Sequence, residues 1–114
     1  MTWHSLGKAG ELIAAHFLRQ KGYRIIQQNF KTKCGEIDII ARDRKKQLVF
    51  IEVKTRSSLH LGQPEESVTP EKLVHLRRCA QIYLSQHRLH CSCRLEILSI
   101  IWGNPPTCKI IPAD

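Results

Sequence analysis

The sequence predicts an α/β protein in which a central mixed β-sheet is flanked by α-helices, with the element order α-β-β-β-α-β-β. Two segments carry apolar residues at helical spacing, and five shorter ones are rich in Ile, Val, Leu and Phe between turn-forming residues. A strand after the second helix can lie parallel to an earlier strand through a right-handed crossover. Because the chain has 114 residues, we expect residues 1–114 to form a single domain.

Helices are expected over residues 5–21 and 70–86. The first is followed by Gly22, which suits the position just after a helix. The second has Thr69 as its N-cap and Pro70 at its first position. The expected apolar stripes consist of Leu6, Ala9, Ile13 and Phe17 in the first helix, and of Leu73, Leu76, Ala80, Tyr83 and Leu84 in the second.

Strands are expected over residues 23–30, 35–41, 48–55, 94–102 and 108–111. The first three suggest an antiparallel meander. Residues 55–68 have no periodicity and are rich in turn formers, so they are interpreted as a loop. Long loops beside a site often contact substrate.

The hairpin formed by the second and third strands carries acids on otherwise apolar strands. A turn centred on Lys45 would place Asp38 opposite Glu52. Opposed side chains have Cβ atoms about 4.5–5.5 Å apart, where like charges repel. Bound Mg²⁺ or Mn²⁺ would offset this repulsion between the two carboxylates. Lys54 shares the face of Glu52, because strand side chains alternate with period two. The alternative is a surface hairpin with an ordinary Lys and Glu salt bridge, but the apolar flanks favour burial.

Glu11 is the odd member of the first helix, because its neighbours three, four and seven residues on are apolar. One interpretation is that Glu11 lies at the edge of the buried stripe and reaches water. The other is that the helix packs on the sheet and brings Glu11 to Asp38 and Glu52 as a third carboxylate. The sequence leaves both open.

The composition favours a polyanionic partner. The chain has 18 Lys+Arg against 10 Asp+Glu, a formal net charge of +8 and a pI near 9.6. Nucleic acid is the commonest such partner, and an anionic membrane surface remains an alternative. No run approaches the ~18 apolar residues of a membrane span and no signal peptide is recognised, so we expect a cytoplasmic protein.

The five cysteines are interpreted as reduced thiols, because their number is odd and they are scattered. Residues 87–93 contain two His and two Cys, but they lack the spaced Cys pairs of structural zinc modules. A helix end followed by a loop is therefore the favoured interpretation of this stretch. The basic residues Lys72, His75, Arg77 and Arg78 of the second helix either touch phosphates or form a solvated face.

The most specific pattern is Gly-Glu-Ile-Asp over residues 35–38 followed by Glu-Val-Lys over residues 52–54. With this pattern the chain resembles the YraN family of small bacterial proteins over residues 6–101. That family is similar to the restriction-endonuclease-like PD-(D/E)xK nuclease superfamily and to archaeal Holliday junction resolvases. The other positions that carry the resemblance are Gly10, Glu11, Gly22, Tyr23, Asn29, Ile39, Ile40, Phe50, Ile51, Thr55, Arg56, Gly62, Ser67, Val68, Thr69, Lys72 and Ala80.

The resemblance implies a restriction-endonuclease-like fold and Mg²⁺-dependent cleavage of phosphodiester bonds. Asp38 and Glu52 would be metal ligands, Lys54 the motif lysine, and Glu11 the helix-borne acid of resolvase-like relatives. Glu96 stands where the family usually has Asp. The residues expected to hold flanking phosphates by charge are Arg56, Lys72 and Arg77.

Two alternatives to a nuclease remain. The first is a noncatalytic nucleic-acid-binding module on a nuclease fold, which would bind by charge. The second is a scaffold that docks another protein through the edge strand near Cys108. For the nuclease, DNA is favoured over RNA as the partner. Resolution of branched DNA would require a twofold homodimer.

Overall fold

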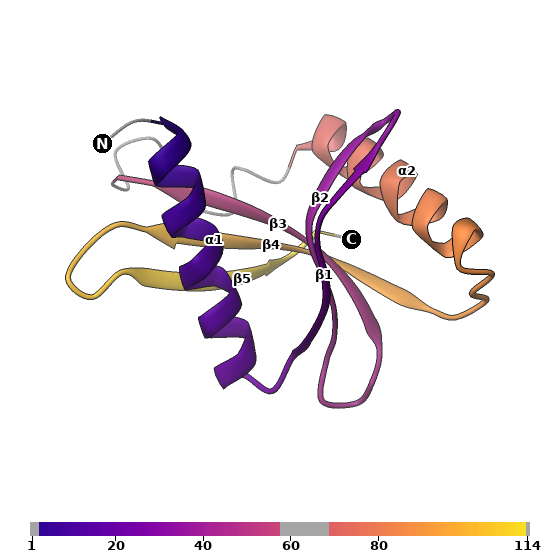
Figure 1. The fold of residues 1–114 in the computed structure, drawn as a ribbon, viewed down its shortest axis with the longest axis horizontal. Coiled ribbons are helices and arrows are strands. Elements are labelled where there is room, and N and C mark those ends of the chain that lie inside the picture. The colour runs from indigo at the N-terminus through magenta and orange to yellow at the C-terminus, as the bar shows by residue number, and fades with distance from the viewer. Residues whose placement is uncertain (1–2, 58–68, 114) are drawn as a thin grey trace.

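The computed structural model describes residues 3–57 and 69–113 (Figure 1). The element order is the predicted one. The elements are α1 (Trp3–Gln20), β1 (Arg24–Thr32), β2 (Gly35–Arg42), β3 (Leu48–Arg56), α2 (Pro70–Gln86), β4 (Cys93–Ile101) and β5 (Thr107–Pro112). Most of the expected loop, residues 58–68, lies outside the described residues.

The five strands form one mixed sheet in the order β1-β2-β3-β4-β5. The first three strands form the expected antiparallel meander, since β2 is antiparallel to both β1 and β3. After α2 the chain returns in β4, which is parallel to β3, and β5 is antiparallel to β4. The α/β architecture with a mixed sheet between helices is therefore confirmed.

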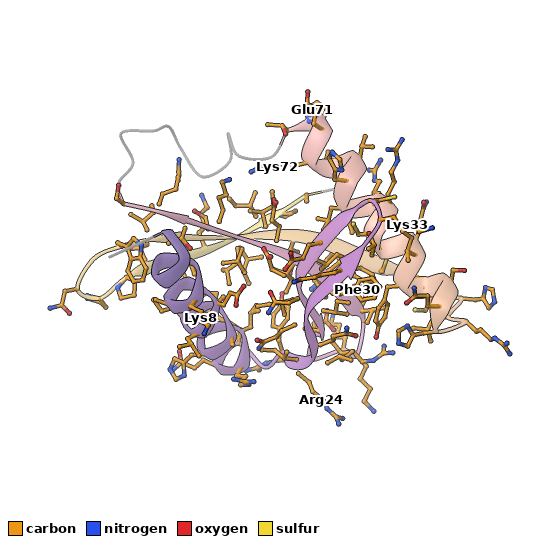
Figure 2. All side chains as sticks on the ribbon, turned by 45° about the horizontal axis from the view of Figure 1, so that its top comes forward. Lys8, Arg24, Phe30, Lys33, Glu71 and Lys72 are labelled. Carbon is orange, nitrogen blue, oxygen red and sulfur yellow. The ribbon has the colours of Figure 1, made fainter. Side chains whose placement is uncertain are left out.

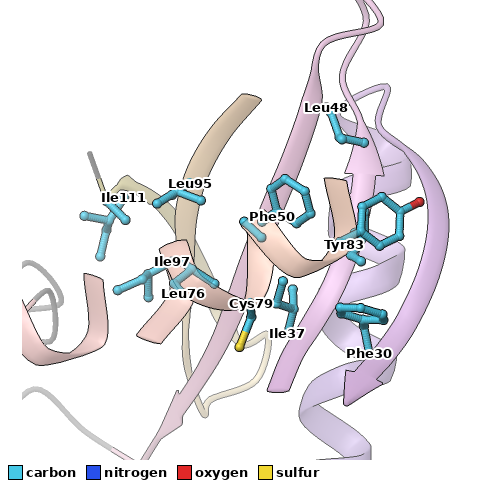
Figure 3. Close-up of a cluster of buried hydrophobic side chains, with 13 residues drawn as sticks. Phe30, Ile37, Leu48, Phe50, Leu76, Cys79, Tyr83, Leu95, Ile97 and Ile111 are labelled. Atoms are coloured by element: carbon cyan, nitrogen blue, oxygen red, sulfur yellow. The ribbon is translucent and has the colours of Figure 1, made fainter. Parts of the chain in front are cut away.

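The two helices cover opposite faces of the sheet, so the central strands are buried on both sides (Figure 1). Under α2, the Tyr83 ring meets Phe30 and Phe50 edge-on, with ring centroids 5.3 and 5.6 Å apart (Figure 3). Under α1, the core is aliphatic. Its buried members are Ala14, Leu18, Ile39, Ala41, Val49, Ile51, Leu98 and Ile100.

The buried stripe of α1 differs from the predicted one. Ala14 and Leu18 are fully buried, whereas Ile13 and Phe17 are only half-buried. Gly10, Ala14 and Ala15 are small and let the helix approach the sheet closely. The buried stripe is therefore rotated from the predicted one by about one residue, or 100°. The side chain of Leu6 lies outside the described part of the structure.

The start of α2 is the predicted one. The Thr69 side chain accepts a hydrogen bond from the Lys72 N–H at 3.3 Å, and Pro70 follows it. The expected stripe needs one correction: Cys79 is buried with Leu76, Ala80 and Tyr83, whereas Leu73 and Leu84 are only partly buried.

A polar network closes the end of the sheet that holds the β2–β3 turn. Glu96 is 5% exposed and accepts hydrogen bonds from the Tyr23 hydroxyl at 3.0 Å and from Arg94 Nε at 3.1 Å. Arg94 also donates to Asp43 Oδ2 at 2.7 Å and to Gln47 Oε1 at 2.6 Å. Burial alone would lower the pKa of Arg94, but its bonds to Asp43, Tyr23 and Glu96 outweigh burial and raise it. Glu96 therefore fixes the sheet to the chain that enters β1.

The cysteines are free, as expected: none of the five is paired with another. Residues 87–92 form a turn and loop, and the His87 ring stacks on Tyr83 with centroids 4.0 Å apart. The loop interpretation of this stretch is thus confirmed over its described residues. None of the helices in residues 3–57 and 69–113 is long and apolar enough to cross a membrane.

Candidate functional site

The pairing of β2 with β3 has the predicted register and ends next to Asp38. The ladder runs from Arg42 opposite Leu48 to Ile39 opposite Ile51. One residue further on, Asp38 directs its carboxylate to β3, where its Oδ2 accepts a hydrogen bond from the Val53 N–H at 2.7 Å. The carboxylate thus satisfies a backbone donor at the end of the ladder and stays between the two strands.

The strands change face at the position of Asp38. Ile37 belongs to the core under α2 and Ile39 to the core under α1, although residues two apart normally share a face. On β1, Asn29 lies between the residues paired with Ile37 and Ile39, and its φ is +54°, a left-handed conformation that Asn tolerates better than most residues. Side chains of both faces therefore meet near Asp38.

The pKa of Asp38 is raised from 3.8 to about 6. Burial is the largest cause, and the Val53 N–H opposes it. The negative charges of Glu52, Glu36 and Glu11 raise the pKa further, in that order. The three predicted carboxylates are thus close enough to act on one another, and Glu36 joins them as a fourth.

Asn29 holds two of these acids together. With its amide NH₂ facing them, Asn29 donates to Glu11 Oε1 at 3.0 Å and to Glu36 Oε1 at 3.1 Å. Of the two interpretations of Glu11, the structure favours the one in which α1 carries this acid to the sheet. Glu36 was not among the predicted acids, although its place in the Gly-Glu-Ile-Asp pattern, two residues before Asp38, was a signal for it.

Lys72 of α2 lies beside Glu52, and the exposed Lys54 of β3 lies beside Lys72. Lys72 Nζ lies 3.9 Å from Glu52 Oε2, and the side chain of Lys72 is 27% exposed. Burial lowers the pKa of Lys72, the charge of Glu52 raises it, and the neighbouring Lys54 lowers it. Lys72 was expected on the surface with the other basic residues of α2, but the crossover after β3 places the start of this helix beside Glu52.

The position of Glu11 depends on the close approach of its neighbour Gly10 to β3. A Cβ atom at Gly10 would collide with Thr55 Oγ1. Thr55 belongs to β3, three residues after Glu52. A glycine here lets α1 approach the sheet at the level of the carboxylates.

The remaining predicted residues lie apart from the carboxylates or at the end of β3. Arg56 is the last residue of β3 and is half-buried. Arg77 lies further along α2 and lines a different hollow, of about 250 Å³, together with Leu84, Cys93 and Leu95. Arg77 does not join the cluster around Asp38.

The residues present fit an oxygen-preferring divalent cation. When ionised, four carboxylates against the ammonium groups of Lys54 and Lys72 leave two negative charges unbalanced. In the described part of the chain, no three His, Cys, Asp or Glu side chains are grouped so as to hold a metal ion. Mg²⁺ does not need such a cage, because it commonly uses one or two carboxylates and completes its shell with water and substrate phosphates.

Comparison with known proteins identifies the family of this chain. The model of the uncharacterised protein family UPF0102 matches residues 10–100, which include all the acids of the site. The chain belongs to the UPF0102 family. This confirms the resemblance to the YraN family.

Many relatives share the family name. A UPF0102 protein of Trichlorobacter lovleyi is 40% identical, and the match covers 95% of this chain and 87% of the relative. UPF0102 proteins of Chlorobium phaeobacteroides strain BS1 and Chlorobium limicola are 50% and 48% identical, with 86% of this chain covered in each case and 78% and 76% of the relatives.

One solved structure, described as "Structure of EndoMS-dsDNA2 complex", aligns with 81% of this chain and 44% of its own chain. The identity is 15% and the TM-score is 0.35. A likeness at this level carries no argument about the present chain.

Proposed function

We propose that this UPF0102 protein is a metal-dependent endonuclease that hydrolyses phosphodiester bonds of nucleic acid. The observation that carries the proposal is the gathering of Glu11, Asp38 and Glu52 with Lys54 at the end of the β2–β3 ladder. Asn29, the Val53 N–H and Lys72 offset part of the cost of this half-buried group of carboxylates, and a bound cation would offset more of it. The resemblance to PD-(D/E)xK nucleases supports the same assignment.

Asp38 and Glu52 would hold Mg²⁺ or Mn²⁺, with Glu11 beside them. The cation, when bound, would lower the pKa of water and neutralise charge on the phosphate. Lys54 would donate to the attacking oxygen or to a nonbridging oxygen of the phosphate. The Val53 N–H fixes the direction of the Asp38 carboxylate, so this acid needs little reorganisation when a substrate arrives.

The charge distribution supports a polyanionic substrate. In residues 3–57 and 69–113, Asp43 and Glu96 bond to Arg94, and Glu71 is the one further acid outside the carboxylate group. Substrate phosphates would therefore meet mostly basic surface around a compact acidic site. Lys72, which lies 3.9 Å from Glu52, would hold a phosphate near the scissile bond, and Arg56 and Arg77 would hold others.

Within this class, the resemblance favours DNA, in particular branched DNA cut by a homodimer in the cytoplasm. A panel of labelled branched, flapped, nicked and single-stranded DNA and RNA, incubated with Mg²⁺ or Mn²⁺, tests the proposal. Cleavage that needs the cation and is lost in Glu52→Gln would support it. Absence of cation-dependent cleavage of every substrate would count against it.

A noncatalytic nucleic-acid-binding module is the second candidate. The specific observation in its favour is that no three-residue metal group is present among the described residues. Isothermal titration with Mn²⁺ separates the two. The nuclease should bind Mn²⁺ with an affinity that falls in Asp38→Asn and in Glu52→Gln, whereas the binding module should show no dependence on these two acids.

A further inference from the structure

A groove runs between α1 and the edge strand β1, and its wall includes Glu11 of the site. It encloses about 470 Å³. The strand order leaves β1 at the edge of the sheet, so the groove is open along its outer side. Its lining residues are Lys8, Glu11, Leu12, Ala15, Arg19 and Gln28.

On the α1 wall of the groove, Lys8 and Arg19 stand at the two ends, and the apolar Leu12 and Ala15 lie between them beside the acid Glu11. Lys8, Leu12, Ala15 and Arg19 recur at spacings of four, three and four residues, which places them on one stripe of the helix. Both basic side chains are exposed, and no ion pair joins either to an acid of the described residues. They are eleven positions apart along the helix, which is a rise of about 16 Å.

Leu12 is the most exposed large apolar side chain of the described residues, at 75%. It lies between the two basic residues and faces solvent, so packing within the protein does not explain a leucine at this position. A duplex turns its bases inward, whereas a single strand presents apolar base faces together with its phosphates. The groove therefore suits an unpaired strand better than a duplex.

We propose that the α1–β1 groove binds one unpaired polynucleotide strand next to the cleavage site, with Lys8 and Arg19 on its phosphates and Leu12 against a base. This inference rests on the proposed function, because Glu11 connects the groove to the nuclease site. It adds a second contact surface on the α1 side of the sheet, opposite Lys72 at the start of α2 (Figure 2). A strand held there would favour substrates with a single-stranded arm at the cut.

Photo-crosslinking locates the strand directly. The full chain carrying p-benzoylphenylalanine at Leu12 is irradiated with a labelled 20-nucleotide oligothymidylate in EDTA, where no cation-dependent cleavage takes place. The matched control carries the same group at Val74, an apolar residue of α2 that is 45% exposed. Strong labelling from position 12 and little from position 74 is expected. Equal labelling, or no binding of the oligonucleotide at all, would overturn the proposal.

Charge removal gives an independent readout. In Lys8→Ala/Arg19→Ala, the slope of log affinity against log salt should fall by about 1.4, because each lost phosphate contact on a single strand contributes about 0.7. Lys33→Ala/Arg88→Ala removes the same charge from exposed positions in the β1–β2 turn and after α2, and should change the slope much less. Equal changes of the salt slope in both double variants would refute strand binding in the groove.

These results stand apart from those on cleavage. Groove binding without any cation-dependent cleavage would remove the proposed nuclease function and leave the strand-binding site. If cleavage is lost in Glu52→Gln but position 12 gives no crosslink, the nuclease function would stand and strand binding in the groove would be refuted.

Discussion

The carboxylate of Asp38 accepts a hydrogen bond from the Val53 backbone N–H at 2.7 Å, just past the last paired residues of β2 and β3. This bond holds an acid between two strands that are buried on both faces. It opposes the effect of burial on the pKa of Asp38 without cancelling it. The site is therefore built at a cost in stability, which several substitutions should reveal.

Asp38→Asn should stabilise the protein above pH 6 when no cation is present. The pKa of Asp38 is about 6 in the folded state against 3.8 ordinarily, so the folded state binds the proton more tightly than the unfolded state. Stability must then fall as pH rises from about 4 to about 6, by about 3 kcal/mol for a change of this size. The substituted amide stays neutral at every pH, and its oxygen can still accept the bond from the Val53 N–H.

Urea denaturation in EDTA at pH 4 and pH 8 measures this difference. We expect a gain of about 1–3 kcal/mol for Asp38→Asn at pH 8 and nearly equal stabilities at pH 4. Glu71→Gln, at an exposed acid of α2, controls for the loss of one negative charge. A gain that is larger at pH 4 than at pH 8 would contradict the assigned environment of Asp38.

Asn29→Asp should destabilise the protein at pH 8. The change replaces the NH₂ that donates to Glu11 and Glu36 with a third carboxylate, so two hydrogen bonds become repulsions. A loss of about 1–3 kcal/mol is expected, and acidification should restore part of it. Asn29→Gly, which tolerates the φ of +54° and adds no charge, should lose less. Wild-type stability of Asn29→Asp at pH 8 would show that Asn29 does not bridge these acids.

Gly10→Ala should weaken the packing of α1 on β3, because the new methyl group meets the Thr55 hydroxyl. A loss of about 1–3 kcal/mol is typical of such overpacking. Thr55→Ala removes the obstructing group, so Gly10→Ala/Thr55→Ala should be more stable than the sum of the two single changes predicts. Strict additivity in a thermal or urea double-mutant cycle would mean that the helix does not depend on this contact.

Arg94→Ala should destabilise the fold without affecting the site. It leaves the buried Glu96 carboxylate with Tyr23 as its remaining donor in the network, which should cost about 3 kcal/mol. Arg94→Ala/Glu96→Gln, which removes the unpaired charge, should recover part of the loss. Because Arg94 bonds to Asp43 and Gln47 at the β2–β3 turn and to Glu96, none of which belongs to the carboxylate site, Mn²⁺ titration of the folded variants should match wild type. Altered Mn²⁺ affinity would refute the separation of the two regions.

The sequence was sufficient for the element order and for the β2–β3 register. Apolar strands joined by a short charged turn allow few pairings, so the register from Arg42 opposite Leu48 to Ile39 opposite Ile51 was predictable from spacing. The expected pair of Asp38 with Glu52 is not part of this ladder, because Asp38 bonds to the Val53 N–H instead. A helical crossover before β4 allowed a parallel return, and β4 is parallel to β3. These features depend on local patterns.

Three features that depend on tertiary contacts were not predicted. A prediction that assumes strict alternation of side chains along a strand misses the change of face at Asn29 and Asp38. It therefore also misses that Glu36 joins the other acids through Asn29. Helical spacing alone places Lys72 among the solvent-facing residues of α2, because nothing local says that the first turn of this helix meets Glu52. Tyr23 and Glu96 are 73 residues apart, and their hydrogen bond exists only in the folded sheet.

The most direct test of the proposed nuclease is the initial rate of Mg²⁺-dependent or Mn²⁺-dependent cleavage of labelled branched DNA. Wild type, Asp38→Asn and Lys54→Ala would be compared, with the fold of each variant checked by circular dichroism. We predict cleavage by wild type and none above background by either folded variant. Cleavage that survives both changes, or its complete absence in wild type on every substrate and with both cations, would contradict the assignment.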